Sequence, residues 1–267
     1  MGEFTGKVII ITGASEGIGR ALALALAPQK PKLVLAARNV ARLEELKAEV
    51  EGLGASALLV PTDVTDQEAC NALIETTVAQ CGGIDVLVNN AGGTMWTLLE
   101  EIEDITIFER LMRLNYLGSV YPTFFAVPHL KRSKGRIVGI SSVAGLIGVP
   151  TRTAYSASKH AMFGFFDSLR VELQGTGVSV TMVAPDFVVS EIHRRALGPD
   201  GKPLGVSPIQ ESKVMTSAEC AALIVPAMEK RERLLLTSSR GKLGRWLKLL
   251  APQFMDNLAV KAIREKK

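Results

Sequence analysis

Tyr155 and Lys159 are two side chains that together can move a proton. They lie four residues apart in a segment with helical periodicity, so both share one face of the predicted helix. A phenol with a pKa of ~10 is a poor proton shuttle at neutral pH unless a nearby cation favours its anion, and Lys159 supplies a cation. Ser142 ends a predicted strand and can hydrogen-bond an oxygen on which negative charge develops. These residue types predict proton transfer at a carbonyl or alcohol oxygen.

A glycine-rich turn near the start of the chain is typical of a phosphate site. Gly13 permits a tight turn, Gly17 lets the backbone approach a pyrophosphate, and Gly19 allows a helix to pack closely on a strand. The first helix then offers unpaired N–H groups to phosphate oxygens. The alternative is a glycine-rich turn without a ligand, but its position after the first strand favours a dinucleotide. The other candidate contacts in this turn are Ser15, Glu16 and Ile18.

The end of the second predicted strand indicates which dinucleotide binds. Sheets that bind NAD usually carry an acidic residue there, which holds the ribose 2′-hydroxyl. This chain has Arg38 followed by Asn39 and no acid, and an arginine can pair with a 2′-phosphate. The alternative is that Arg38 is a solvated residue at the start of a helix. We predict NADP(H) as the cofactor.

Strand-like and helix-like segments alternate along the chain. Strands that are apolar on both faces are typical of a parallel sheet covered by helices on both sides. The alternation predicts one doubly wound α/β domain of the Rossmann type over residues 1–267, with an irregular substrate loop at about 186–215. Predicted strands cover residues 7–11, 32–37, 56–60, 84–88, 136–140 and 178–183, and predicted helices cover 18–27, 40–53, 66–80, 104–131 and 153–174.

Composition excludes several classes of protein. The chain has 267 residues, of which 47% are hydrophobic and 22% charged, so it can form a full core and is not disordered. Its three cysteines lack the spacing of a disulfide scaffold or a metal site. The segment 240–267 carries eight of the 31 Lys and Arg residues, so a nucleic-acid surface across the body is excluded. Without a signal pattern or a spanning apolar run, we predict a cytoplasmic protein.

Taken in order along the chain, these motifs resemble the short-chain dehydrogenase/reductase family. The resemblance covers almost the whole chain and implies NADP-dependent, reversible hydride transfer between a carbonyl and a secondary alcohol. It implies that Tyr155 is the general acid and base, Ser142 orients the carbonyl, Lys159 binds the nicotinamide ribose, and Asn115 holds a water in a proton relay. The cofactor contacts predicted beyond the glycine-rich turn are Arg38, Asn39, Asp63, Val64, Asn90, Ala91, Gly92, Tyr155, Lys159, Pro185, Val188 and Ser190.

Three positions depart from the pattern of the family. Asp186 stands where the family usually has glycine, which puts a carboxylate near the pocket for the cofactor amide. The family usually has a threonine a few residues after that glycine, and here the hydroxyl of Ser190 takes its place. Glu16 occupies a position that is often basic in members preferring NADP, so it weakens that preference without reversing it.

The substrate is predicted from a narrower resemblance. Parts of the chain are similar to 3-ketosphinganine reductases, 11β-hydroxysteroid dehydrogenases and 1-acyl-dihydroxyacetone-phosphate reductases, which act on lipophilic ketones. Leu98, Ile147 and Val149 flank the matched residues and predict either an apolar pocket or ordinary core and dimer contacts. The basic sequence 193–195 is interpreted as a solvated turn, with contact to an anionic substrate or the cofactor phosphate as the alternative. The candidate substrate contacts are Ser142, Leu146, Tyr155, Phe187 and Ile192.

Three functions are consistent with this pattern. The first is NADPH-dependent reduction of a bulky, lipid-like ketone, such as a 3-keto-sphingoid base, a steroid or an acyl-ketone. The second is an alcohol dehydrogenase for a small polar substrate, which an acid at residue 36 would have favoured. The third is a catalytically silent NADP(H)-binding sensor, against which the intact set of motifs argues.

Two surfaces are predicted to contact partners. The family implies a homodimer or homotetramer through the helices at 104–131 and 153–174, with apolar residues at 111, 114, 163, 165, 166 and 169. The tail, 240–267, combines an apolar stripe, a tryptophan and basic flanks, as an interfacial membrane helix does. The alternative is that this stripe packs on the body or on a neighbouring subunit near the substrate mouth.

Overall fold

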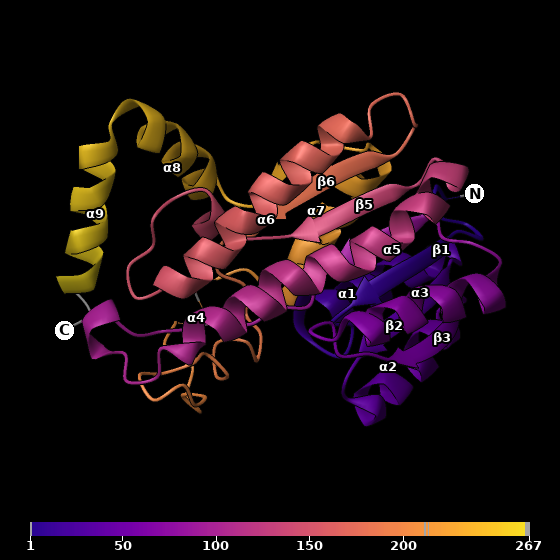
Figure 1. The fold of residues 1–267 in the computed structure, drawn as a ribbon, viewed down its shortest axis with the longest axis horizontal. Helices are drawn as coiled ribbons and strands as arrows, with labels where there is room; N and C mark the ends of the chain where they lie inside the picture. The colour runs from indigo at the N-terminus through magenta and orange to yellow at the C-terminus, as the bar shows by residue number, and fades with distance from the viewer. Residues whose placement is uncertain (1, 211, 213, 265–267) are drawn as a thin grey trace.

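The protein is built on one parallel β-sheet. The computed structural model describes residues 2–210, 212 and 214–264, with side chains described up to residue 260. Seven strands are all parallel and lie in the order β3-β2-β1-β4-β5-β6-β7, so the winding direction reverses between β1 and β4 (Figure 1). The strands are β1 (Val8–Thr12), β2 (Lys32–Ala37), β3 (Ser56–Pro61), β4 (Val86–Asn89), β5 (Arg136–Ile140), β6 (Ser179–Ala184) and β7 (Leu234–Leu236).

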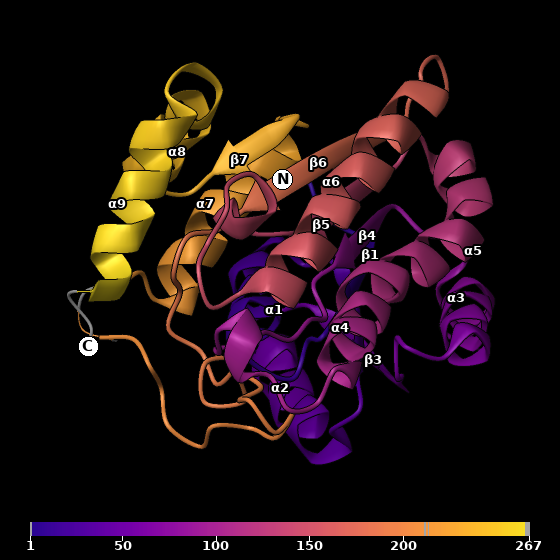
Figure 2. The ribbon, with the colours of Figure 1, turned by 60° about the vertical axis from the view of Figure 1, so that its left-hand side comes forward.

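Helices cover both faces of the sheet (Figures 1 and 2). One core cluster joins the sheet to α1, α2 and α7, and a second joins it to α3, α5 and α6. Both faces of the sheet are buried because its strands are apolar on both sides. The prediction of a doubly wound Rossmann fold is confirmed. The helices are α1 (Gly17–Leu26), α2 (Val40–Gly52), α3 (Gln67–Cys81), α4 (Thr106–Leu111), α5 (Gly118–Ser133), α6 (Thr153–Glu172), α7 (Ser217–Glu229), α8 (Ser239–Leu250) and α9 (Pro252–Arg264).

The six predicted strands are present, with ends that differ by one or two residues. The seventh strand, β7, and helix α7 were not predicted. A run of three leucines at the edge of a sheet has no period that distinguishes it from helix or loop, and its assignment depends on pairing with β6.

The single helix predicted over residues 104–131 is wrong in one respect. A π-helical turn, Met112–Leu117, separates α4 from α5. The Gly118 N–H bonds the Arg113 carbonyl, five residues back, which makes the extra bulge of a π-turn. Pro122 lacks the N–H that would bond the Gly118 carbonyl, so regular helix is weakened at this junction. Asn115 lies inside this turn.

The long segment between β6 and α7 is held against the body by isolated bridges. Val188 pairs with Met215, and Leu197 pairs with Met95 on the segment after β4. The Trp96 N–H also donates to the Leu197 carbonyl at 2.9 Å. These bridges fasten the predicted substrate loop across the carboxyl edge of the sheet.

The residues predicted for a subunit interface are partly used inside the chain. Phe163 and Phe166 are buried in the core cluster under α6, and Leu111 is buried in a smaller cluster near α4. They cannot form an interface without unfolding, which corrects that part of the prediction. On the same helices, Phe124 and Val171 are the large apolar side chains that face solvent.

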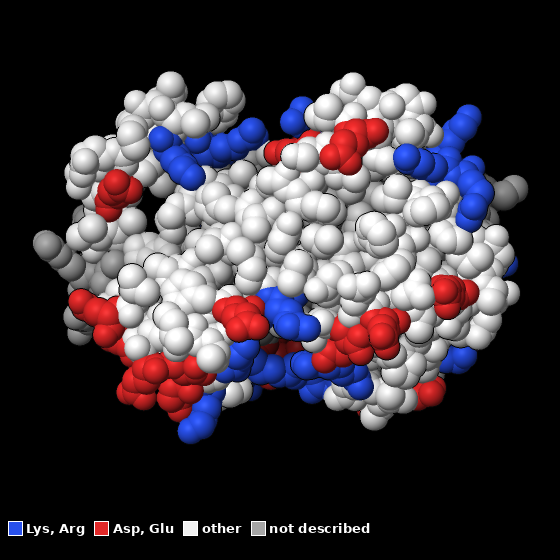
Figure 3. Space-filling model, viewed as in Figure 1, with Lys and Arg blue, Asp and Glu red and all other residues white. Residues whose placement is uncertain are grey.

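Charge on the surface is mixed. On the face shown in Figure 3, Lys and Arg alternate with Asp and Glu, so no single sign dominates it. None of the helices in the part of the chain that the structure describes is long and apolar enough to cross a bilayer.

Candidate active site

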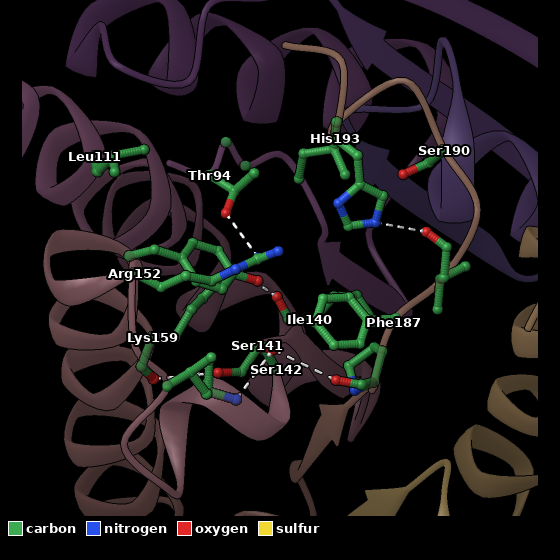
Figure 4. A pocket seen from close by; sticks show the side chains of 18 of the residues that line it. Thr94, Leu111, Ile140, Ser141, Ser142, Arg152, Lys159, Phe187, Ser190 and His193 are labelled. Carbon is green, nitrogen blue, oxygen red and sulfur yellow. Dashed lines mark hydrogen bonds between the residues drawn. The ribbon is translucent and has the colours of Figure 1, made fainter. Parts of the chain in front are cut away.

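A large cavity opens along the carboxyl edge of the sheet. Its volume is about 1500 Å³, and it runs from the glycine-rich turn after β1 to the two tail helices. Because all strands are parallel, the loops after β1, β2, β4, β5 and β6 meet at this edge and line the cavity (Figures 1 and 4). The predicted cofactor contacts that line it are Gly13, Ser15, Glu16, Gly17, Ile18, Arg38, Asn39, Asp63, Val64, Asn90, Ala91, Gly92, Tyr155, Lys159, Pro185, Val188 and Ser190.

The glycine-rich turn is shaped by backbone that other residues would strain. Gly13 and Gly17 have φ of +63° and +55°, in the left-handed region that glycine enters freely. A Cβ on Gly13 would lie 2.8 Å from the Ala91 Cα, and a Cβ on Gly19 would lie 2.5 Å from the Gly13 carbonyl oxygen. Gly19 therefore packs behind the turn and does not line the cavity. The Asn90 amide donates to the carbonyl oxygens of Thr12 and Gly13, at 2.9 and 3.1 Å, and fixes the turn to β4.

Five charged residues lie around the end of β2 and the glycine-rich turn. Arg38 is 75% exposed and lies 3.7 Å from Asp63. Burial acts to raise the pKa of Asp63, but hydrogen bonds from the Thr65 N–H and hydroxyl outweigh it and hold that pKa below its usual value. Glu16 accepts hydrogen bonds from Arg42 and, through both Nη atoms, from Arg195 at 2.6 and 2.8 Å.

Arg42 was not predicted to lie at this site, and Arg195 was considered only as part of the basic sequence 193–195. Their pairing neutralises the Glu16 carboxylate, so Glu16 presents no unpaired negative charge to a phosphate. The interpretation of residues 193–195 as a solvated turn holds for Arg194 and Arg195, whose side chains are about half exposed in a turn, although Arg195 is also ion-paired. It is wrong for His193, which is buried with Nε2 3.0 Å from the Val188 carbonyl. Arg195 is 179 residues from Glu16, so no local pattern signals the contact. Asn39 accepts a hydrogen bond from the Arg42 N–H and caps α2.

Tyr155, Lys159 and Ser142 all line the cavity, and the Lys159 ammonium lies 5.9 Å from the centroid of the Tyr155 ring. Figure 4 shows Lys159 and Ser142 among the residues that line this cavity. Lys159 is buried, and its ammonium donates to the Ile140 carbonyl at 3.0 Å. Burial lowers the pKa of Lys159 to about 7. Burial raises the pKa of Tyr155, while a hydrogen bond with Ser142 and the positive charge of Arg152 oppose that rise. The Ser142 hydroxyl also accepts from the Ala144 N–H at 3.1 Å, which fixes its position at the end of β5.

Asn115 lies behind the cavity and does not line it. Its amide exchanges two hydrogen bonds with the backbone of Gly93, at 2.8 and 3.0 Å, and donates a third to the Ser158 hydroxyl at 2.8 Å. The π-helical turn therefore joins the loop after β4 to α6, the helix that carries Tyr155 and Lys159. In this structure the Asn115 side chain fixes Gly93 and Ser158 relative to each other.

Asp186 anchors the tail to the sheet. It follows β6 and accepts hydrogen bonds from Arg240 Nη2 at 2.7 Å and from the Ser238 hydroxyl at 2.8 Å, both at the start of α8. Burial acts to raise its pKa, but the hydrogen bonds and charge of Arg240 outweigh that and hold the pKa below its usual value. The carboxylate that departs from the family pattern is therefore paired with the tail.

The anchored tail forms one wall of the cavity. Leu247, Met255 and Leu258 of α8 and α9 line it opposite Phe187 and Ile192. In Figure 3 the tail stands off from the body, with an opening between them. Of the predicted substrate contacts, Leu146 lies outside the cavity and packs on the core cluster under α6, while its neighbour Ile147 lines the cavity. The apolar residues Leu98 and Val149 also line it.

Fold and site together define an α/β protein of the Rossmann class. The chain belongs to the short chain dehydrogenase family, whose sequence profile matches residues 7–198, and is an oxidoreductase of that family. It is 39% identical to an 11-beta-hydroxysteroid dehydrogenase of Pinus massoniana over 86% of this chain and 67% of that protein. It is 36% identical to 11-beta-hydroxysteroid dehydrogenase A of Sesamum indicum over 95% of this chain and 74% of that protein. The predicted resemblance to the family and to its hydroxysteroid dehydrogenases is confirmed.

Solved structures of the family have the same fold. A short chain dehydrogenase/reductase from Burkholderia phymatum in complex with NAD has a TM-score of 0.84 and 27% identity, covering 95% of this chain and 96% of that one. An alcohol dehydrogenase from Thermococcus sibiricus complexed with 5-hydroxy-NADP has a TM-score of 0.74 and 26% identity, covering 86% of this chain and 95% of that one. Similar structures thus hold cofactors with and without a 2′-phosphate.

The anchor formed by Asp186 generates a prediction about acid stability. Because its pKa is lower in the folded chain, Asp186 contributes stability above its unfolded pKa near 3.8, and the contribution is lost as pH falls through the lower folded value. Asp186→Asn should lower the free energy of unfolding by about 1 kcal/mol at pH 6. The difference from the native protein should shrink below pH ~4. Chemical denaturation at both pH values measures this.

The matched control for this experiment is Asp256→Asn, which removes an exposed carboxylate from α9 in the same tail. It should leave the free energy of unfolding unchanged at both pH values. A difference between native protein and Asp186→Asn that is the same at pH 6 and pH 3 would contradict the ion-pair assignment.

Proposed function

We propose that this oxidoreductase uses NADPH to reduce a bulky, lipophilic ketone to a secondary alcohol, in a reversible reaction. The observation that carries the proposal is that Ser142, Tyr155 and Lys159 lie together in one cavity whose outer wall is apolar. Acid–base groups placed within an apolar cavity suit a substrate with one reactive oxygen on a large hydrocarbon body.

The residues around the glycine-rich turn fit the predicted dinucleotide. Gly13 and Gly17 line the cavity without side chains, so a diphosphate can approach the backbone there, and α1 begins at this turn with unpaired N–H groups. Gly13 and Asn90 would lie along the diphosphate, Asp63 and Val64 near the adenine, and Lys159 at the nicotinamide ribose. When bound, the cofactor supplies the hydride.

The protein's own residues move the proton. Ser142 donates a hydrogen bond to the substrate oxygen and orients it, and the Tyr155 hydroxyl donates the proton when that oxygen becomes an alkoxide. In the reverse direction the tyrosinate accepts the proton, and protonated Lys159 stabilises the tyrosinate. Asn115 positions this set by holding α6 against the loop after β4.

A preference for NADP over NAD is supported by three arginines near the end of β2. Arg38 is exposed there, and Arg42 and Arg195 surround Glu16. No carboxylate follows Arg38 in the position that would hold a ribose 2′-hydroxyl. A 2′-phosphate would meet a net positive surface, because two guanidinium groups pair with the one Glu16 carboxylate.

The tail suggests how a lipophilic substrate reaches the cavity. Leu247 faces the cavity, whereas Trp246 and Leu250 are 61% and 80% exposed on the outside of α8. Lys242 and Arg245 are exposed on α8, whereas the Lys248 ammonium donates to the Leu146 carbonyl at 2.8 Å. Lys266 and Lys267 of the predicted basic tail lie outside the described residues. We propose that α8 rests reversibly on an anionic membrane surface while its inner face guides the substrate.

Two further points belong to the proposal. The apolar wall disfavours a small polar alcohol as the substrate, and the intact proton-transfer residues disfavour a silent sensor.

We also propose a homodimer or homotetramer through α5 and α6, supported by the exposed side chains of Phe124 and Val171.

Tyr155→Phe tests the catalytic assignment. The variant should fold and bind NADPH normally but lower kcat at least ~100-fold, because general acid catalysis contributes about that much. Tyr121→Phe on α5, outside the large cavity, is the matched control and should keep native turnover. Steady-state oxidation of NADPH with a lipophilic ketone measures both, and near-native turnover of Tyr155→Phe refutes the assignment.

Arg38→Asp tests the cofactor preference. It removes a charged hydrogen bond to the 2′-phosphate and adds repulsion, so the affinity for NADPH should fall at least ~10-fold while NADH binds as well or better. Arg132→Asp, a charge reversal on α5, is the control. Fluorescence titration gives both dissociation constants, and a constant ratio between them would show that Arg38 does not recognise the phosphate.

A pair of tail variants separates the two roles of α8. Replacing Trp246 and Leu250 by Ser should weaken binding to phosphatidylserine vesicles and leave KM for soluble ketones unchanged. Leu247→Ser should instead raise KM for long-chain ketones more than for short ones, because it changes the cavity wall. Deleting residues 240–267 should do both. Co-sedimentation and a chain-length series measure these effects; if the Trp246 and Leu250 substitutions leave vesicle binding intact, the membrane proposal is wrong.

A further inference from the structure

Arg152 is a buried cation in the cavity that the reaction proposed above does not use. It precedes α6, is 5% exposed, and extends across the cavity towards Thr94 (Figure 4). Its Nη1 donates to the Thr94 hydroxyl at 3.1 Å. Among the residues that the structure describes, no carboxylate pairs with it within 4.0 Å, and its Nε and Nη2 have no hydrogen-bond acceptor.

Aromatic rings surround the guanidinium. Its central carbon lies 4.2 Å from the ring centroid of Trp96, 5.2 Å from that of Phe187 and 5.6 Å from that of Tyr155. These faces attract the cation, but they do not accept the hydrogen bonds of its edge. Burial lowers the pKa of Arg152 only to about 10, so the group stays charged at neutral pH. The cavity therefore holds a positive charge that lacks an anion.

The two nitrogens without acceptors lie on one edge of the guanidinium. Nε–H and the adjacent Nη2–H point in the same direction, on the side away from the Nη1 that Thr94 holds. Both nitrogens are themselves buried, so a neighbouring side chain must shift for a ligand to reach them. Two parallel N–H groups at this spacing match the two oxygens of a carboxylate or phosphate. Two other arginines at the cavity are paired with carboxylates: Arg195 with Glu16, and Arg240 with Asp186.

We propose that Arg152 binds an anionic oxygen group of the substrate, a carboxylate or a phosphate, close to the carbonyl that is reduced. The inference rests on the proposed function and narrows its substrate to an amphiphilic oxo-acid or oxo-phosphate. The anionic group lies deep in the cavity beside Tyr155, and the hydrocarbon chain extends towards Leu247 and Met255 on the tail. Arg152 is thus a specificity-determining residue.

An alternative role for Arg152 acts only through Tyr155. A cation at this distance favours the tyrosinate whatever the substrate, so it would alter turnover of charged and uncharged ketones equally. A contact with a substrate anion instead affects only substrates that carry the anion. Substrate pairs of equal shape and different charge distinguish these two roles.

The experiment compares γ-oxo-myristate with its primary amide and with the corresponding γ-oxo-alkyl phosphate. Binding is measured by calorimetry in the Tyr155→Phe protein saturated with NADPH, which does not depend on turnover. The better of the two anions should bind about 10- to 100-fold more tightly than the amide. Arg152→Met should remove that difference. Arg152→Lys should restore part of it, because lysine keeps the charge but lacks the two parallel N–H groups.

The control is Arg233→Met, which removes an exposed arginine beside β7 with the same change in net charge and should leave the difference intact. Equal affinities for both anions and the amide in the Tyr155→Phe protein with Arg152 intact overturn the proposal without any substitution at Arg152. An equal loss for all three probes in Arg152→Met also overturns it, because a contact with the anion cannot affect the uncharged amide. Equal losses of turnover for the acid and the amide when Arg152→Met is made in the native enzyme would instead support the role through Tyr155. If the anion binds selectively but the native enzyme reduces none of the probes, the proposed function fails and the anion site stands.

Discussion

The parallel direction of every strand is the constraint on which the site depends. Parallel strands place all their carboxyl ends at one edge, and the reversal of winding between β1 and β4 opens a crevice there. The glycine-rich turn after β1, Ser142 after β5 and Asp186 after β6 meet at that edge although they are far apart in sequence. Asn90 and Asn115 fasten the loops of this edge to one another, so the backbone around the cavity is fixed before any ligand binds.

The charges of the cavity are divided between its rim and its interior. At the rim the carboxylates are matched by guanidinium groups, as in Glu16 with Arg42 and Arg195, and Asp186 with Arg240. In the interior Lys159 and Arg152 are buried without a carboxylate partner among the described residues. An unpaired buried charge is costly for folding, and such charges are concentrated where a protein acts on its ligands. This asymmetry favours electron-rich groups deep in the site.

The ion pair between Asp186 and Arg240 links the chemistry of the site to the choice of substrate. It fixes the start of α8 directly after β6, so the tail becomes a wall of the cavity that also contains Tyr155. The exposed outer side of α8 and its cavity-facing inner side then belong to one rigid element. On the proposed function, the lipophilic substrate would enter through the opening beside this element, and the proposed membrane contact of α8 would lie next to that opening (Figure 3).

The sequence by itself determined the features that short-range spacing encodes. Six strands, the turn at Gly13–Gly19 and the shared helical face of Tyr155 and Lys159 follow from local periodicity, because each depends on residues close together in the chain. The tertiary structure alone decided which distant groups meet: Arg195 with Glu16, Arg240 with Asp186, and Arg152 with Thr94. It also placed Ile147, and not Leu146, in the cavity and interrupted the helix at Asn115. These contacts arise from packing between elements, and no pattern along the chain specifies the partner of a charged side chain.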